Sequence, residues 1–198
     1  MDCYLQLTQK IAAPALDRGE RKALVLFAAA LPGEGTSYVA RGFGERLAAQ
    51  TGRRVLVAEA ARLRRLDLAE CMRVADHCRP TPLPNLCVLT DDDDGDDANS
   101  HAPHDWQRDP EFSFDALRAL RFDFDHVLID CRSLEESSEA ALLAPHTDAV
   151  VLVAEADRAR RAQIAQAQRV IENARGRLLG CVLNKRRYTI PAWLYRRI

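Results

Sequence analysis

The chain has 198 residues, a mass of 22.1 kDa and a formal net charge of -1, and 47% of its residues are hydrophobic. This length predicts one domain with a complete hydrophobic core, and the near-neutral charge argues against a nucleic-acid-binding protein that acts through its overall charge. No apolar run of about 18 residues predicts a membrane span, and the first residues lack the pattern of a signal peptide. The six cysteines show no CxxC spacing, which favours buried thiols of a reduced cytoplasmic protein over a metal site.

Short apolar runs rich in β-branched residues recur along the chain and are bounded by turn-forming residues. Their lack of polar alternation is typical of parallel strands that are covered on both faces. The runs predict strands at 23–29, 54–59, 85–90, 126–131, 148–155 and 177–184. Patterns of helical period predict helices at 36–50, 66–77, 112–120, 136–143 and 159–175. This alternation predicts an α/β fold with a doubly wound, mostly parallel sheet of about six or seven strands flanked by helices.

The predicted domain spans 21–184, with three further regions around it or within it. Residues 1–20 are an N-terminal extension. Segment 91–110 is rich in aspartate, and its composition favours a mobile, solvated loop over a metal site. Residues 185–198 are a basic and aromatic C-terminal tail.

The stretch LPGEGTS, at 31–37, lies between the first predicted strand and the first predicted helix, which is the context of a phosphate-binding loop. Gly33 and Gly35 can adopt positive φ, so that backbone N–H groups converge on an anion. The start of the helix adds a partial positive charge. A plain turn between a strand and a helix is the alternative, but the retained Gly-Glu-Gly sequence favours a loop that still binds an anion.

Four stretches follow one another in the order of one known family: ALPGEGTSYVARGFGERLAAQTGRRVLVAEAARLRR, FDHVLIDCRS, DAVVLVAEADRARRAQIAQA and LLGCVLNK. In these stretches, which cover about 21–187, the chain resembles the ATPase domains of bacterial tyrosine kinases (BY-kinases) of exopolysaccharide and capsule operons, relatives of ParA- and MinD-type ATPases. The resemblance implies a P-loop NTPase-like fold, self-association, and ATP or ADP bound with Mg²⁺. The nucleotide-binding positions that it implies are Gly33, Glu34, Gly35, Thr36, Ser37, Tyr38 and Asn184, and the implied Mg²⁺ ligands are Ser37 and Asp130.

The chain departs from the family at positions that carry the chemistry. Thr36 stands where the family has the lysine that neutralises the β- and γ-phosphates. The family's aspartate pair on the second strand, in the pattern D-A-D, reads Glu59-Ala60-Ala61 here, so one carboxylate is longer and the other is lost. Ser37 and Asp130 keep the hydroxyl and the carboxylate of the magnesium site. In an active protein, Glu59 and Asp130 would be the catalytic carboxylates.

These departures favour loss of catalysis. Phosphoryl transfer depends on positioning and charge stabilisation, so losing the loop cation is expected to lower turnover by about a hundredfold or more. No arginine lies in the loop, and Lys22 is expected at the wrong end of the first strand. Only Lys185, after the last strand, offers a displaced lysine, an alternative that we favour less. An active Mg-ATP-dependent tyrosine autokinase and a ParA/MinD-like positioning protein remain as alternatives.

The tail carries two tyrosines, Tyr188 and Tyr195, where the family has a tyrosine cluster. They are the candidate phosphorylation sites, but the basic and apolar composition also fits docking to a partner or to an anionic membrane surface, or a short helix packed on its own domain. The resemblance implies a Wzz-like membrane polysaccharide co-polymerase as partner. We therefore expect a catalytically degenerate scaffold or regulator of exopolysaccharide biosynthesis or export. It would lie in the cytoplasm, at the inner face of the cell membrane, without a nucleic-acid partner.

Overall fold

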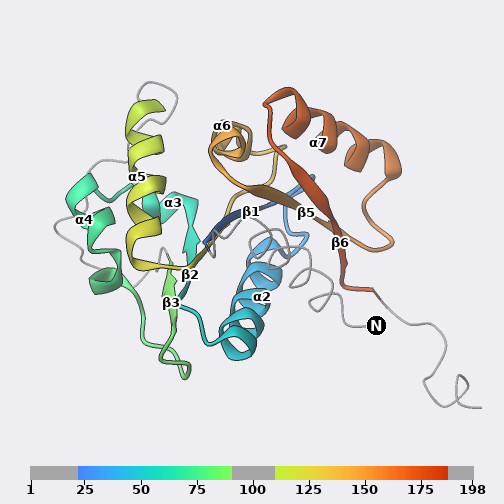
Figure 1. Ribbon diagram of the computed structural model, residues 1–198. Helices are drawn as coiled ribbons and strands as arrows, with labels where there is room; N and C mark the ends of the chain where they lie inside the picture. The colour runs from blue at the N-terminus through green and yellow to red at the C-terminus, as the bar shows by residue number, and fades with distance from the viewer. Residues whose placement is uncertain (1–21, 91–109, 187–198) are drawn as a thin grey trace, which may run out of the picture.

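The computed structural model describes residues 22–90 and 110–186. Its strands form one parallel sheet in the order β3-β2-β4-β1-β5-β6, which Figure 1 shows in the middle of the domain. The strands are β1 (Ala23–Ala29), β2 (Val55–Glu59), β3 (Leu86–Leu89), β4 (His126–Asp130), β5 (Ala149–Glu155) and β6 (Leu178–Asn184). The predicted doubly wound parallel sheet is confirmed, and each strand begins and ends within one residue of its predicted bounds.

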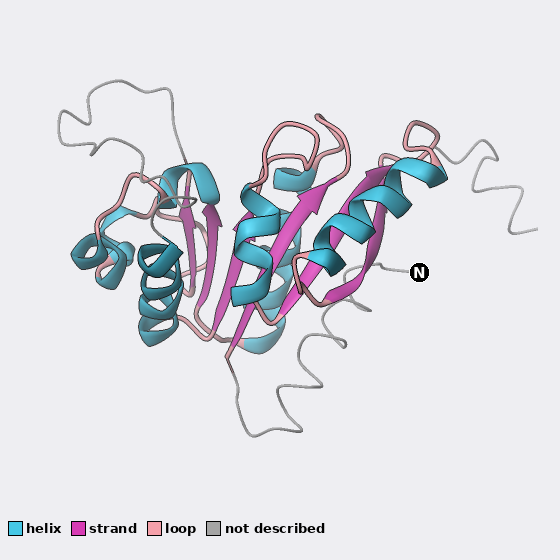
Figure 2. Cartoon of the chain, turned by 90° about the horizontal axis from the view of Figure 1, so that it is seen from above, coloured by secondary structure: helices cyan, strands magenta, loops and turns pink. Residues whose placement is uncertain are grey.

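The helices cover the two faces of the sheet unequally (Figures 1 and 2). They are α2 (Thr36–Thr51), α3 (Ala60–Leu63), α4 (Leu68–Met72), α5 (Pro110–Asp123), α6 (Glu139–Leu143) and α7 (Arg161–Asn173), with short 3-10 helices η1 (Val74–His77) and η2 (Ala144–His146). Of the described helices, α2 alone packs on one face, whereas α5, α6 and α7 pack on the other. Strands β1 to β5 are therefore largely buried on both sides, as their continuous apolar runs predict. Strand β6 is only partly covered, and its Cys181 is exposed, so the prediction of buried thiols is wrong for this cysteine.

Helix α2 lies very close to the sheet. Val39, Phe43 and Leu47 recur every four residues on its buried face. A Cβ atom on Gly44 would lie 2.4 Å from Cγ2 of Val57, so only glycine allows this close approach. The same helix begins at the end of the candidate loop, and its packing therefore fixes the position of that loop.

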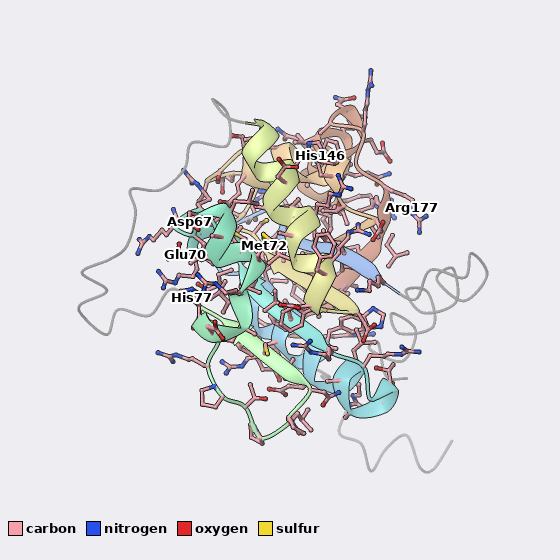
Figure 3. All side chains as sticks on the ribbon, turned by 60° about the vertical axis from the view of Figure 1, so that its left-hand side comes forward. Asp67, Glu70, Met72, His77, His146 and Arg177 are labelled. Carbon is pink, nitrogen blue, oxygen red and sulfur yellow. The ribbon has the colours of Figure 1, made fainter. Side chains whose placement is uncertain are left out.

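The prediction of one helix at 66–77 is wrong. This segment forms α4 and η1 with a break at Arg73, and the short helix α3 precedes it. The start of α4 is set by Asp67, whose carboxylate accepts from the N–H of Glu70 at 2.7 Å while the Glu70 carboxylate accepts from the N–H of Asp67 at 2.7 Å. Figure 3 shows these two side chains next to each other. Such a capping box marks the start of a helix, so the helix begins only after Asp67.

Three other helices have different bounds from those predicted, and one of them, α7, is two residues shorter at each end than the predicted helix at 159–175. Helix α5 begins earlier, at Pro110, a residue type that suits the first turn of a helix because it lacks an N–H group. Helix α6 begins later, at Glu139, after a turn in which the Ser133 hydroxyl donates to the Glu136 carboxylate at 2.7 Å. Local hydrogen bonds of this kind compete with helix formation.

Strand β6 forms one edge of the sheet and contains a bulge. Val150 pairs with Leu178, but Val151 pairs with Gly180, so Leu179 is an additional residue in β6. Beyond the bulge the pairing is regular and ends with Glu155 opposite Asn184.

Several predictions concern segments outside the described residues. These are the N-terminal extension 1–20, nearly all of the acidic segment 91–110, and the tail with Tyr188 and Tyr195. In the described ranges, no helix combines the length and the apolar character needed to cross a bilayer.

Candidate functional site

The carboxyl ends of the parallel strands bring the predicted site residues to one edge of the sheet. Strand β1 lies between β4 and β5, and the candidate loop follows it directly. Asp130 ends β4 opposite Glu59, which ends β2. Asn184 ends β6 opposite Glu155, which ends β5. Ligands of open α/β sheets bind at this edge, so the fold places the candidate residues where function is expected.

The loop at 31–35 has the backbone conformation of a tight, glycine-dependent turn. Gly33 and Gly35 have φ values of 75° and 88°, in the left-handed region. A Cβ atom on Gly35 would lie 2.3 Å from Nδ2 of Asn184, so a side chain is excluded there by space as well as by backbone conformation. The Asn184 amide donates to the carbonyl oxygen of Glu34 at 2.9 Å. The end of β6 therefore packs directly on the loop.

The side chain of Glu34 is buried inside the protein. Its carboxylate accepts from the N–H of Leu31 at 2.9 Å and from the N–H of Glu155 at 3.1 Å. These two bonds join the loop to the end of β5. The carboxylate is thus a structural element of the loop, and a contact between Glu34 and a nucleotide stays a prediction.

The hydroxyl of Ser37 hydrogen-bonds to the buried carboxylate of Asp130. Burial raises the pKa of Asp130 to about 6, the Ser37 hydrogen bond opposes this rise, and the charges of Glu59 and Glu139 add to it. Glu139 is itself buried, and burial raises its pKa against the opposing charges of Arg64 and Arg132. Sequence reasoning missed Glu139, because nothing in its position along the chain indicates that it lies beside Asp130.

The oxygen donors of this region fit a magnesium ion only in part. Ser37 and Asp130 lie together, as the Mg²⁺ prediction requires. Among the described residues, however, no cluster of three or more His, Cys, Asp or Glu side chains is arranged to hold a metal ion. Mg²⁺ is usually bound through one or two protein ligands together with waters and phosphate oxygens. The pair therefore fits an ion that arrives with a nucleotide.

Two cationic side chains reach the loop from other strand ends. Lys185 Nζ donates to the carbonyl oxygen of Gly33 at 2.7 Å, and Arg158 Nη1 donates to that of Pro32 at 2.8 Å. Sequence reasoning placed Lys185 at this edge as the less favoured alternative, and it missed Arg158. The signal for Arg158 was the basic stretch RARR at 158–161, which is separated from the end of β5 by two residues.

The remaining predicted positions lie in the first turn of α2. Thr36 is buried, and Tyr38 is 73% exposed. Their contacts with a nucleotide stay predictions, as do those of Gly33, Gly35, Ser37 and Asn184.

No family model matches the sequence, and no curated protein matches it. Three solved structures illustrate its similarity in fold. They are the chimerical protein CapA2B2 (17% identity, 93% of this chain and 84% of that chain, TM-score 0.70), the kinase domain of Escherichia coli tyrosine kinase ETK (17%, 93% and 83%, 0.66) and the Pyrococcus furiosus cell division ATPase MinD (20%, 88% and 78%, 0.59). The chain therefore has the fold shared by bacterial tyrosine kinase domains and MinD-type ATPases, as its sequence motifs predict.

Proposed function

We propose that this protein is a catalytically degenerate relative of the BY-kinase domains. It acts at the cytoplasmic face of the membrane as a scaffold or regulator of a Wzz-like polysaccharide co-polymerase in exopolysaccharide biosynthesis or export. The observation that carries the proposal is Thr36, an uncharged residue at the lysine position of a loop whose architecture is otherwise kept.

The geometry around Thr36 supports impaired catalysis. The loop is tied to β5 through Glu34 and to β6 through Asn184, so the protein itself supplies contacts that hold its conformation. Catalysis of phosphoryl transfer needs a fixed cation beside the transferred group. Loss of one such electrostatic contact lowers the rate by about a hundredfold to a thousandfold.

The carboxylates support the same conclusion. The family's second aspartate on the second strand is replaced by Ala61, so one of the carboxylates that would work with Asp130 is lost. Glu59 lies opposite Asp130 in the sheet, one methylene longer than the family's aspartate. The role that remains is binding through surfaces, with self-association and a membrane partner as the resemblance to BY-kinases implies.

The test of lost catalysis is incorporation of labelled phosphate into the purified full chain with Mg-ATP. We expect no label on Tyr188 or Tyr195. The matched variant is Thr36→Lys combined with Glu59→Asp and Ala61→Asp, which restores the family's loop lysine and aspartate pair and should gain measurable ATP hydrolysis. Labelling of the wild type that is lost in Asp130→Asn would overturn the proposal.

The test of the scaffold role is co-purification with the co-polymerase. We expect a complex in the absence of nucleotide, formed equally by the wild type and by Asp130→Asn. A complex that forms only with ATP and only in the wild type would contradict a scaffold that works without turnover.

One observation favours a second candidate. Because Lys185 contacts Gly33, an active Mg-ATP-dependent tyrosine autokinase could use this lysine in place of the loop lysine. The labelling experiment distinguishes the two candidates. The ParA/MinD-like alternative would show itself as salt-sensitive binding to DNA or to vesicles of anionic lipid.

A further inference from the structure

Two cations share one carboxylate at the mouth of the loop. Lys185 Nζ lies 3.1 Å from Oε2 of Glu155, and Arg158 Nη1 lies 3.4 Å from the same oxygen. The two side chains come from different connections, Arg158 after β5 and Lys185 after β6. One negative charge therefore faces two positive charges beside Gly33.

The other partners of these cations are weak. Lys185 and Arg158 bond to the carbonyl oxygens of Gly33 and Pro32, which carry no formal charge. Both side chains are about half exposed, at 47% and 49%, so an incoming ligand can reach them without a change in fold. An ion pair with a phosphate oxygen adds a charge–charge attraction that a hydrogen bond to an uncharged carbonyl oxygen lacks. An anion at this place would thus attract both cations away from the carbonyl groups.

Lys185 also lies beside the start of α2. A Cβ atom on Gly35, the N-cap residue of this helix, would be 3.8 Å from Cε of Lys185, and one on Gly33 would be 3.6 Å from Nη1 of Arg158. The stem of the lysine therefore passes the point at which the loop becomes helix. Thr36, the first residue of this helix, is uncharged, so the helix start has no cationic side chain of its own.

We propose that Lys185, assisted by Arg158, is the phosphate-binding cation of this loop, in place of the lysine that is absent at position 36. Glu155 is the counter-ion that Lys185 leaves when a phosphate group binds. The ligand is a phosphate group, carried either by a nucleotide or by a free anion such as pyrophosphate. The inference goes beyond the proposed function, because it requires neither turnover nor a protein partner.

Glu155 gives the proposal a specific consequence. Its hydrogen bond from Lys185, with a smaller contribution from Arg158, lowers the pKa of this carboxyl group, so Glu155 is charged at neutral pH. A charged Glu155 competes with a bound phosphate for both cations. Removal of this charge should therefore strengthen phosphate binding, although Glu155 itself lies at the site.

The experiment is calorimetric titration of the full chain with ADP, with ATP and Mg²⁺, and with pyrophosphate, at protein concentrations that detect a millimolar Kd. We expect Lys185→Gln to weaken binding by about tenfold to a hundredfold, the effect of losing one charge-assisted contact. Glu155→Gln should strengthen it, and Arg158→Gln should weaken it less than Lys185→Gln does.

The matched control is Lys22→Gln. Lys22 is also an exposed lysine, but it lies before β1 and donates to the carbonyl oxygen of Arg121 at 2.5 Å, so its loss should leave binding unchanged. Binding of the Lys185→Gln variant as tight as that of the wild type would overturn the inference. So would a folded wild-type protein that binds none of the three ligands.

The ligands also separate the two sources of phosphate. ADP binding much tighter than pyrophosphate binding identifies a nucleotide as the ligand, and equal affinities identify a free anion. Either ligand supports the role of Lys185 when Lys185→Gln weakens its binding. Binding that needs Lys185 and is accompanied by ATP hydrolysis would overturn the proposed loss of catalysis but not this inference.

Discussion

Replacement of Asp130 by asparagine should stabilise the protein at neutral pH. Asp130 is 8% exposed, and burial raises its pKa from 3.8 to about 6. A shift of about two units corresponds to about 3 kcal/mol, which is the unfavourable free energy of holding this carboxylate charged in the folded state at pH 7. Asparagine carries no charge, and its amide oxygen can still accept the hydroxyl of Ser37.

The raised pKa of Asp130 also predicts how the stability of the protein changes with pH. Because the folded pKa lies above the unfolded one, the folded state holds a proton that the unfolded state releases between about pH 4 and pH 6. The contribution of Asp130 to stability is therefore fully present below about pH 4 and is lost as the pH rises through about 6. The charges of Glu59 and Glu139 add to this rise in the pKa of Asp130.

The assay is urea denaturation of the wild type and of Asp130→Asn at several pH values from 4.5 to about 7.5. We expect the difference in the free energy of unfolding to grow with pH and to reach a few kcal/mol in favour of the variant near pH 7. A variant that is less stable than the wild type at pH 7, or a difference that does not change with pH, would refute the reasoning from burial.

Three further substitutions test the packing of the loop and of α2. Glu34→Gln should lower the free energy of unfolding by about 1–3 kcal/mol, because one of the two N–H groups that bond to this carboxylate would face an amide donor. The control is Glu45→Gln, at an exposed position of α2. Equal thermal midpoints of the two variants would contradict a structural role of the buried Glu34 carboxylate. Gly44→Ala should cost about 1–3 kcal/mol through its clash with Val57, despite the better helix propensity of alanine, and a raised midpoint would show that the close approach is wrong. Gly52→Ala meets no atom within 4 Å but has a φ of 64°, so a loss of about 1 kcal/mol is expected in urea denaturation, and no loss would indicate a relaxed helix end.

The strands could be predicted well because buried parallel strands are readable as continuous apolar runs. The run at 148–155, for example, gives β5 almost unchanged. The helices were harder, because their bounds depend on local hydrogen bonds. The pattern at 66–77 is compatible with one helix, and only the side-chain geometry of Asp67 and Glu70 shows where α4 begins.

The candidate site could be predicted in outline but not in its contacts. The rule that parallel strands end at one edge is enough to bring Asp130 and Asn184 towards the loop. The carboxylate of Glu34 could not be assigned, because burial and a bond to the N–H of Glu155 depend on tertiary structure. The contact between Lys185 and Gly33 joins residues far apart in sequence, and it depends on the pairing of β5 with β6.

That pairing makes the loop sensitive to the length of the chain at a remote point. If β6 continued without interruption from the pair Val150–Leu178, Leu183 would stand opposite Glu155, and an apolar side chain would face the loop. The additional residue at the bulge moves the strand on by one position, which presents Asn184 there and lets Lys185 follow. A single insertion or deletion near the start of β6 would therefore change which residues face the loop, although the residues at the end of the strand would not themselves be substituted.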